Sequence, residues 1–195
     1  MVCGIDEAGR GPLAGPVTAA AVVLPRGFPF HVLADSKVLS AAKREAAATV
    51  IRENAVAWSV AWAWPREIDE INIHHATLLA MARCHNRLLM RVRMSGVPNA
   101  VTRVLVDGKF VPAVESPCEA IVRGDSLIPE ISAASILAKT ARDRWMTEYA
   151  AHDPRYGFEK HKGYPTSAHR EAVRQHGLCI IHRVTFCRGL ENTPT

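Results

Sequence analysis

Long apolar stretches, paired cysteines and internal repeats are all missing from this chain of 195 residues. No apolar run approaches the roughly 20 residues needed to cross a bilayer, so no membrane span is predicted. The five cysteines are scattered and contain no Cys-x-x-Cys pair, which argues against a disulfide framework or a zinc site. Asp6 and Glu7 come too early for a secretory signal peptide. We therefore expect a cytoplasmic protein that is not associated with a membrane.

The composition is that of a globular protein, with 48% hydrophobic and 22% charged residues. The length predicts a single domain over residues 1–195. The net charge of +5 is uneven, because residues 1–138 carry 14 basic and 13 acidic side chains, whereas residues 139–195 carry 10 and 6. This excess suits a polyanionic partner, although many proteins that bind no nucleic acid are equally basic.

Apolar runs and helix signals alternate along the chain, which predicts an α/β protein with a mixed sheet. The predicted strands are 2–5, 17–24, 57–63, 103–106 and 119–122, and the predicted helices are 40–53, 65–94, 128–149 and 167–176. Small residues in the stretch 128–149 would let that helix pack closely against the sheet.

Acidic residues follow three of the predicted strands. They are Asp6 with Glu7, Asp107 and Asp125. Strand ends of an α/β sheet meet at one crevice, so the four carboxylates are expected to converge. Together they could hold two hard divalent cations, which activate a water and stabilise the leaving oxygen of an in-line phosphoryl displacement. The pattern therefore predicts a metal-dependent enzyme that acts on phosphate esters.

The pair Asp6-Glu7 presents a geometric difficulty. Neighbouring residues of a flat strand point to opposite faces, so both reach one site only if the strand ends or kinks there. Gly9 and Gly11 make a kink reasonable. An isolated Asp-Glu pair is most often a solvated strand end, and only the further acids Asp107 and Asp125 favour the metal interpretation.

The turn that follows, Gly9-Arg10-Gly11, combines close backbone approach with exposed amides that suit a phosphate. With Gly15 its spacing is G-x-G-x-x-x-G, which differs from the dinucleotide-binding fingerprint. A strand rather than a helix is predicted next, so an NAD-binding oxidoreductase is the weaker alternative.

Basic residues flank an aromatic ring at 161–166, the stretch His-Lys-Gly-Tyr-Pro-Thr. Tyr164 there could stack on a sugar or base while cations hold phosphates, and a turn with a half-buried tyrosine is the alternative. Trp58, Trp62 and Trp64 alternate along one strand face and are expected in the core rather than in a binding platform.

Several of these motifs, in this order, resemble bacterial ribonuclease HII over nearly the whole chain. They are the segment 4–17, Asp35-Ser36-Lys37, the segments 72–81 and 125–146, and Gly163-Tyr164-Pro165-Thr166. The resemblance implies a ribonuclease H-like fold, with a central mixed β-sheet flanked by helices. A C-terminal helical extension that binds substrate would start at about residue 150.

The resemblance also implies an activity and a partner. Such an endonuclease cuts the RNA strand of RNA-DNA hybrids, incises 5′ to single ribonucleotides in duplex DNA, and leaves 5′-phosphate and 3′-hydroxyl ends. The partners would be RNA-DNA hybrid and DNA duplex containing ribonucleotides, and we expect a monomer. A binding module without catalytic activity is an alternative of a different class, and the presence of all four acids argues against it.

The same resemblance assigns roles to individual residues. Asp6, Glu7, Asp107 and Asp125 would be catalytic and would bind Mn²⁺ or Mg²⁺. The Gly-Arg-Gly motif, which reads the 2′-hydroxyl at the RNA-DNA junction, would be Gly9, Arg10 and Gly11, and the junction tyrosine would be Tyr164. Lys109 departs from the family, which usually has asparagine there, and Thr185 stands where serine is usual.

Overall fold

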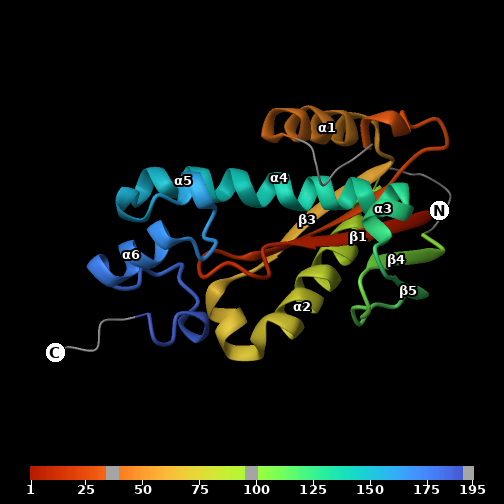
Figure 1. Ribbon diagram of the computed structural model, residues 1–195. Coiled ribbons are helices and arrows are strands. Elements are labelled where there is room, and N and C mark those ends of the chain that lie inside the picture. The colour runs from red at the N-terminus through yellow and green to blue at the C-terminus, as the bar shows by residue number, and fades with distance from the viewer. Residues whose placement is uncertain (34–39, 95–100, 191–195) are drawn as a thin grey trace.

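A computed structural model describes residues 1–33, 40–94 and 101–190 of the protein (Figure 1). Its centre is a five-stranded mixed sheet with the strand order β3-β2-β1-β4-β5. The strand β2 is antiparallel to both β3 and β1, whereas β4 is parallel to both β1 and β5. The strands are β1 (Val2–Ala8), β2 (Val17–Val23), β3 (Ala57–Ala63), β4 (Arg103–Asp107) and β5 (Cys118–Ile121).

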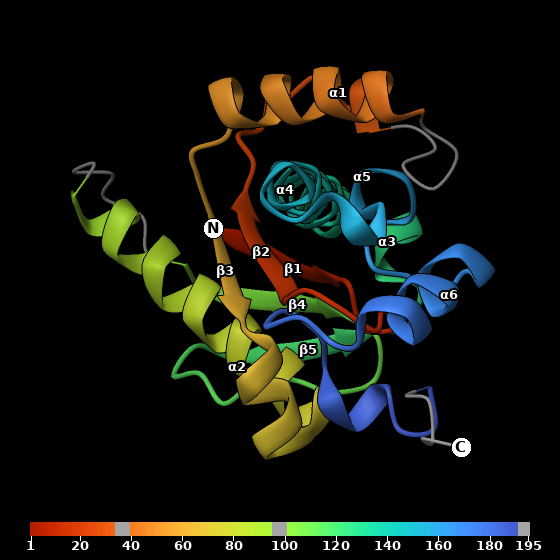
Figure 2. The same cartoon turned by 90° about the vertical axis from the view of Figure 1, so that its left-hand side faces the viewer.

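Helices cover both faces of the sheet. Figure 2 shows α4 on one face with α1 stacked outside it, and α2 on the opposite face. The α-helices are α1 (Ala41–Asn54), α2 (Pro65–Met94), α3 (Gly124–Leu127), α4 (Pro129–His152), α5 (Phe158–His161) and α6 (Ser167–His176), and 3-10 turns occupy Phe30–Leu33, Pro154–Tyr156 and Val184–Phe186. The predicted α/β architecture is therefore confirmed. No helix in the described part of the chain is long and apolar enough to span a membrane.

The strand β2 is apolar along its whole length because both of its faces are covered. Ala19 and Ala21 belong to the apolar layer beneath α2, whereas Ala20 and Val22 belong to the layer beneath α4 and α1. All seven residues of β2 are buried. A continuous apolar run is the pattern expected of such a strand.

Small residues bring α4 against β1, as the sequence predicts. Ala133, Ala134 and Ala138 are fully buried in α4. On the strand side, a Cβ atom added to Gly4 would lie 2.1 Å from the carbonyl carbon of Glu130. The backbones of the helix and the strand are therefore in direct contact, and α4 is fixed beside the acidic end of β1.

The helix α2 is not continuous, contrary to the expectation of one helix over 65–94. Asn72 has φ 63° and ψ 165°, and it separates two helical segments. Its side-chain oxygen accepts hydrogen bonds from the backbone amides of His74 (3.0 Å) and His75 (3.2 Å). Asn72 therefore caps the N-terminus of the second segment, a role for which asparagine is well suited.

Three arginines of α2, spaced four residues apart, lie along the outer edge of β3. Each donates a hydrogen bond to a backbone carbonyl of that strand. The bonds run from Arg83 to Trp62 (2.9 Å), from Arg87 to Val60 (3.0 Å) and from Arg91 to Trp58 (2.7 Å). These carbonyls belong to alternate residues of an edge strand, so they face away from β2.

The tryptophans of β3 are less buried than the sequence predicts. Ala57, Ser59, Ala61 and Ala63 fill the buried face of the strand. Trp58 and Trp62 are half-buried, and Trp64, just beyond the strand, is 42% exposed. The regular alternation predicts this strand correctly, but the small residues, not the aromatic ones, face α2.

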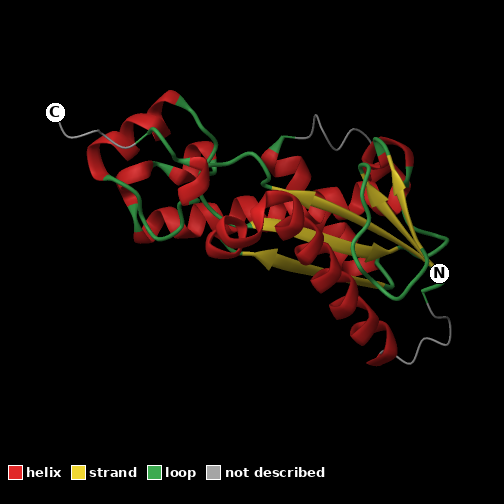
Figure 3. Ribbon diagram, turned by 90° about the horizontal axis from the view of Figure 1, so that it is seen from below, coloured by secondary structure: helices red, strands yellow, loops and turns green. Residues whose placement is uncertain are grey.

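The elements after His152 pack around the far end of α4 and lie beyond the end of the sheet (Figures 1 and 3). A separate apolar cluster holds them together, and it contains Met146 of α4 with Tyr156, Phe158 and Val173. This cluster corresponds to the C-terminal part expected from about residue 150. Its role in substrate binding stays a prediction.

Candidate active site

The two adjacent acids Asp6 and Glu7 lie inside β1, which is longer than the predicted strand 2–5. One-to-one pairing with β2 continues past both residues to Ala8. The strand therefore neither ends nor bulges between Asp6 and Glu7, and the predicted kink is wrong. The change of direction comes only at Gly9, which has φ 92°.

Asp107 joins these two acids at the end of the neighbouring strand. The parallel pairing of β1 with β4 ends at Ile5 and Val106, so Asp107 stands beside Asp6 where the ladder stops. Burial raises the pKa of Asp6 well above its usual range, and the charges of Glu7 and Asp107 raise it further. Burial also raises the pKa of Glu7, against the opposing effect of Arg10, whose guanidinium lies 3.3 Å from the Glu7 carboxylate.

Asp125 completes the acidic group from a helix rather than from a strand end. The strand β5 stops at Ile121, the chain turns at Arg123 in a left-handed conformation, and Asp125 falls in the first turn of α3. Its backbone amide donates a hydrogen bond to Asp107 Oδ1 at 3.3 Å. The side chain is almost entirely buried. The four predicted acids thus lie near one another, although the unkinked strand turns Asp6 and Glu7 toward opposite faces and Asp125 comes from a helix rather than from a strand end.

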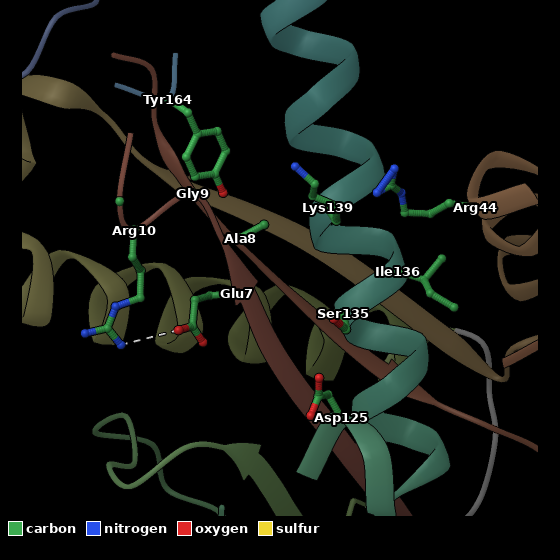
Figure 4. Close-up of a pocket in the computed structure, with 11 residues that line it drawn as sticks. Glu7, Ala8, Gly9, Arg10, Arg44, Asp125, Ser135, Ile136, Lys139 and Tyr164 are labelled. Carbon is green, nitrogen blue, oxygen red and sulfur yellow. Dashed lines mark hydrogen bonds and ion pairs between the residues drawn. The ribbon is translucent and has the colours of Figure 1, made fainter. Parts of the chain in front are cut away.

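A pocket of about 390 Å³ connects this acidic group with the glycine turn (Figure 4). Two of the acids and all four residues of the predicted substrate-binding set line it. The lining residues are Glu7, Asp125, Gly9, Arg10, Gly11 and Tyr164, together with Ala8, Arg44, Ser135, Ile136 and Lys139. The residues that the sequence placed in two separate motifs therefore share one cavity.

Arg44, Ser135 and Lys139 were not predicted as site residues. Ser135 and Lys139 are four residues apart on α4, so they present the same helix face to the pocket. That spacing is the signal that could have identified them. No comparable pattern identifies Arg44 of α1. The motif Asp35-Ser36-Lys37 lies outside the described residues.

Tyr164 faces the glycine turn across the pocket. A Cβ atom added to Gly11 would lie 3.9 Å from Tyr164 Cε1. The ring is 39% exposed, and the Lys139 ammonium lies 5.5 Å from its centre. A cation beside an accessible ring is suited to a ligand that combines a flat or apolar surface with phosphate.

Two buried histidines support Tyr164 from behind. His169 Nδ1 donates to the Tyr164 carbonyl (3.0 Å), and His182 Nε2 donates to His169 Nε2 (3.1 Å). The remaining nitrogen, His182 Nδ1, accepts from the backbone amide of Cys179 (2.9 Å). Since each nitrogen has a fixed role as donor or acceptor, this chain of bonds requires both rings to be neutral.

This requirement predicts a loss of stability in mild acid. Burial lowers the pKa of His169 and of His182 to about 4, from an unperturbed 6.5. The unfolded chain therefore binds more protons below about pH 6.5, and stability falls as the pH falls from 7 toward 4. We expect urea unfolding at pH 5 to give a free energy about 2 kcal/mol or more below that at pH 7.5. His169→Gln should flatten this dependence, whereas removal of the exposed His31 should not, and a flat wild-type profile would contradict the prediction.

The acids fit divalent metal ions by their chemistry. All four are oxygen donors, and the raised pKa values of Asp6 and Glu7 show that buried negative charge in this group lacks full compensation. A hard cation supplies such compensation. Within residues 1–33, 40–94 and 101–190, no group of three or more His, Cys, Asp or Glu side chains is placed so that it could hold a metal ion as it stands.

The alternative of a dinucleotide-binding turn is not supported by the fold. That fingerprint leads from a strand into a helix, whose N-terminus holds the pyrophosphate. Here the turn after β1 leads into the strand β2. The helix that the dinucleotide would need is therefore replaced by a strand.

Solved structures with the same fold define the class. The ribonuclease H2 of Pyrococcus horikoshii OT3 matches with a TM-score of 0.72 and 25% identity, covering 97% of this chain and 96% of that one. The ribonuclease HII in a complex with PCNA from Archaeoglobus fulgidus matches with a TM-score of 0.75 and 23% identity, covering 100% and 98%. These matches define the ribonuclease H-like fold class.

Sequence comparison gives the family. The model of the ribonuclease HII family matches residues 3–189. The ribonuclease HII of Laribacter hongkongensis is 54% identical over 187 residues, and that of Nitrosospira multiformis is 51% identical over 185 residues. Each alignment covers 95% of this chain, with 90% and 88% of the respective relatives. The chain belongs to the ribonuclease HII family and is a ribonuclease H hydrolase.

Proposed function

We propose that this enzyme cuts the RNA strand of RNA-DNA hybrids and also incises 5′ to single ribonucleotides in duplex DNA, leaving 5′-phosphate and 3′-hydroxyl ends. Membership of the ribonuclease HII family supports the activity on hybrids. The pocket that joins Glu7 and Asp125 to the glycine turn and Tyr164 carries the rest of the proposal. In that pocket the acids lie beside a surface suited to a sugar-phosphate backbone.

The four acids would bind the metal ions. Asp6, Glu7, Asp107 and Asp125 would hold two Mg²⁺ or Mn²⁺ ions, and oxygen ligands suit either metal. Bound ions of this kind supply an activated water and charge stabilisation of the leaving oxygen. The backbone amides at Glu7 and Asp125 donate to Asp6 (2.7 Å) and Asp107 (3.3 Å), so the protein orients two of the four carboxylates.

The glycine turn and Tyr164 would recognise the substrate. The turn Gly9-Arg10-Gly11 would contact the 2′-hydroxyl, because only this group distinguishes a ribonucleotide from its neighbours in DNA. Tyr164 would stack on the adjoining deoxyribose. Arg44 and Lys139 would hold phosphates, which position a duplex without reading its sequence.

A comparison of two duplexes tests this function. One carries a single ribonucleotide, and the other is all DNA and otherwise identical. With Mg²⁺ or Mn²⁺, we expect a single incision on the 5′ side of the ribonucleotide, a 3′ end that a polymerase extends, and no cut in the DNA control. Equal cleavage of both duplexes would overturn the proposed recognition.

Gly11→Ala tests contact between the turn and the substrate. Inside the protein the added Cβ would meet only Tyr164 Cε1, at 3.9 Å, which is an ordinary contact distance. We therefore expect unchanged stability but a fall in kcat/KM of about tenfold or more, because the methyl group displaces the substrate backbone. Thermal unfolding and cleavage kinetics measure the two effects.

Gly9→Ala is the matched comparison. Its Cβ would lie 2.0 Å from Arg142 Nε, and its φ of 92° disfavours any side chain. This variant should lose stability as well as activity. If Gly11→Ala keeps the wild-type kcat/KM, the turn does not approach the substrate. The monomeric state and the cytoplasmic location stay predictions.

A further inference from the structure

Two arginines are completely buried behind the glycine turn. Arg142 of α4 and Arg183 of the C-terminal segment are both 0% exposed. Each donates three hydrogen bonds to backbone carbonyls, in place of the carboxylate that a buried arginine usually meets. The acceptors for Arg142 are Pro16 (2.9 Å), Ala14 (3.0 Å) and Lys162 (3.0 Å), and those for Arg183 are Gly9 (2.6 Å), Arg10 (2.9 Å) and Gly15 (2.9 Å).

The bonds from Arg183 orient the part of the turn that lines the pocket. They hold the carbonyls of Gly9 and Arg10 toward the interior. In a planar trans peptide, the amide of the next residue points the opposite way. The amides of Arg10 and Gly11 are therefore directed away from Arg183, and both residues line the pocket.

The two guanidinium groups also place positive charge beneath the turn. Burial lowers the pKa of Arg142 to about 10 and that of Arg183 to about 9, so both stay protonated at neutral pH. Burying an ion is costly, and an apolar side chain would fill the same space at lower cost. Fixed charge beneath outward-pointing amides favours a phosphate or another electron-rich group at the surface.

The residue before Arg183 connects to the other side of the pocket. His182 holds His169, which in turn holds the carbonyl of Tyr164. The two residues after Arg183 are also fixed, because Asp69 accepts hydrogen bonds from the amides of Val184 (2.8 Å) and Thr185 (2.9 Å). The dipeptide His182-Arg183 is thus anchored on α2 through the two residues that follow it, bonded directly to the turn, and connected to Tyr164 through His169.

We propose that His182 and Arg183 are positioning residues that set the distance between the Gly-Arg-Gly turn and Tyr164, and thereby the preference for an RNA-DNA junction over a continuous RNA strand. This inference rests on the proposed function. Neither residue lines the pocket, so both act through the groups that they hold. A junction substrate needs the turn on its ribonucleotide and Tyr164 on the next sugar together, whereas a long RNA strand offers many registers.

The test compares kcat/KM for a duplex with one ribonucleotide and for a continuous RNA-DNA hybrid. Arg183→Lys keeps the charge but loses the planar fork that reaches three carbonyls. We expect the ratio of the two kcat/KM values to fall about tenfold, as loosened positioning predicts. Arg188→Lys, at an exposed position five residues further on, is the matched control and should leave the ratio unchanged.

A second pair of variants decides the matter if Arg183→Lys does not fold. His182→Gln retains a donor for His169, whereas His182→Leu removes it. We expect the leucine variant to lose junction preference to the same degree as Tyr164→Ala, and the glutamine variant to recover most of it.

The outcomes separate this inference from the proposed function. If wild-type protein cuts neither substrate, the proposed function fails. If wild-type protein prefers the junction, and Arg183→Lys or His182→Leu keeps that preference or slows both substrates equally, the positioning role is overturned.

Discussion

Asp107→Asn should lower kcat/KM on the ribonucleotide duplex by about 10³-fold or more, which corresponds to about 4 kcal/mol of transition-state stabilisation. Asp107 stands between the acids of β1 and Asp125, and its charge contributes to the raised pKa values of Asp6 and Glu7. Asparagine has the same shape and still offers an oxygen to the amide of Asp125. The substitution therefore removes a negative charge and one oxygen of the proposed metal-binding group without removing the contact with the Asp125 amide.

Single-turnover cleavage and duplex binding, measured separately, show whether the loss is in the chemical step. Duplex binding without metal should change less than about threefold, because Arg44 and Lys139, the proposed phosphate-binding side chains, are untouched. Glu119→Gln is the matched control. It neutralises an exposed carboxylate on the adjacent strand β5, where Glu119 pairs with Arg103, and should leave cleavage unchanged. Cleavage by Asp107→Asn close to the wild-type rate would remove Asp107 from the catalytic group.

Gly4→Ala should lower the free energy of unfolding by about 3 kcal/mol or more, the upper part of the range for overpacked cores. The added Cβ would lie 2.1 Å from the Glu130 carbonyl carbon and 2.4 Å from the Ile131 nitrogen. These are backbone atoms of α4, so no side chain can rotate away to relieve the overlap. Either α4 moves away from β1 or the strand distorts, two residues before Asp6.

Urea unfolding of the purified variant measures this effect. Gly27→Ala is the control, because a Cβ there would meet nothing within 4 Å, and its effect should stay within about 0.5 kcal/mol. A loss below about 1 kcal/mol for Gly4→Ala would show that α4 shifts easily. In that case the close contact of helix and strand would not be what fixes the acidic group.

Local pattern was sufficient to predict most of the sheet. Val17–Val23 is apolar at every position because helices cover both of its faces, and a continuous run of this kind is the expected signal. The break at Asn72 was not predicted. Helical periodicity continues on both sides of it, and the capping bonds that define the break depend on a backbone conformation rather than on composition.

The candidate site likewise has one part that the sequence predicts and another part that it does not. Asp6, Glu7 and the glycine turn are neighbours in the chain, so their association follows from the motif itself. Arg183 bonds to Gly9 across 174 positions of sequence, and its acceptor is a carbonyl that every residue carries. Such a bond therefore cannot be predicted from the residue types. The observed strand β1 continues to Ala8 instead of ending at Ile5, and β5 begins and ends one residue earlier than predicted. Pairing with neighbouring strands, rather than the apolar pattern, decides where a strand stops.

The row of arginines along β3 has a consequence for association between molecules. An edge strand with free carbonyls is a template on which another chain can add a strand, the usual first step of sheet-to-sheet aggregation. At β3, an incoming strand would have to displace the charge-assisted bonds that Arg83, Arg87 and Arg91 make to Trp62, Val60 and Trp58. The enzyme therefore keeps this side of its sheet closed to strand exchange, even though two tryptophans of that strand remain half-exposed to water.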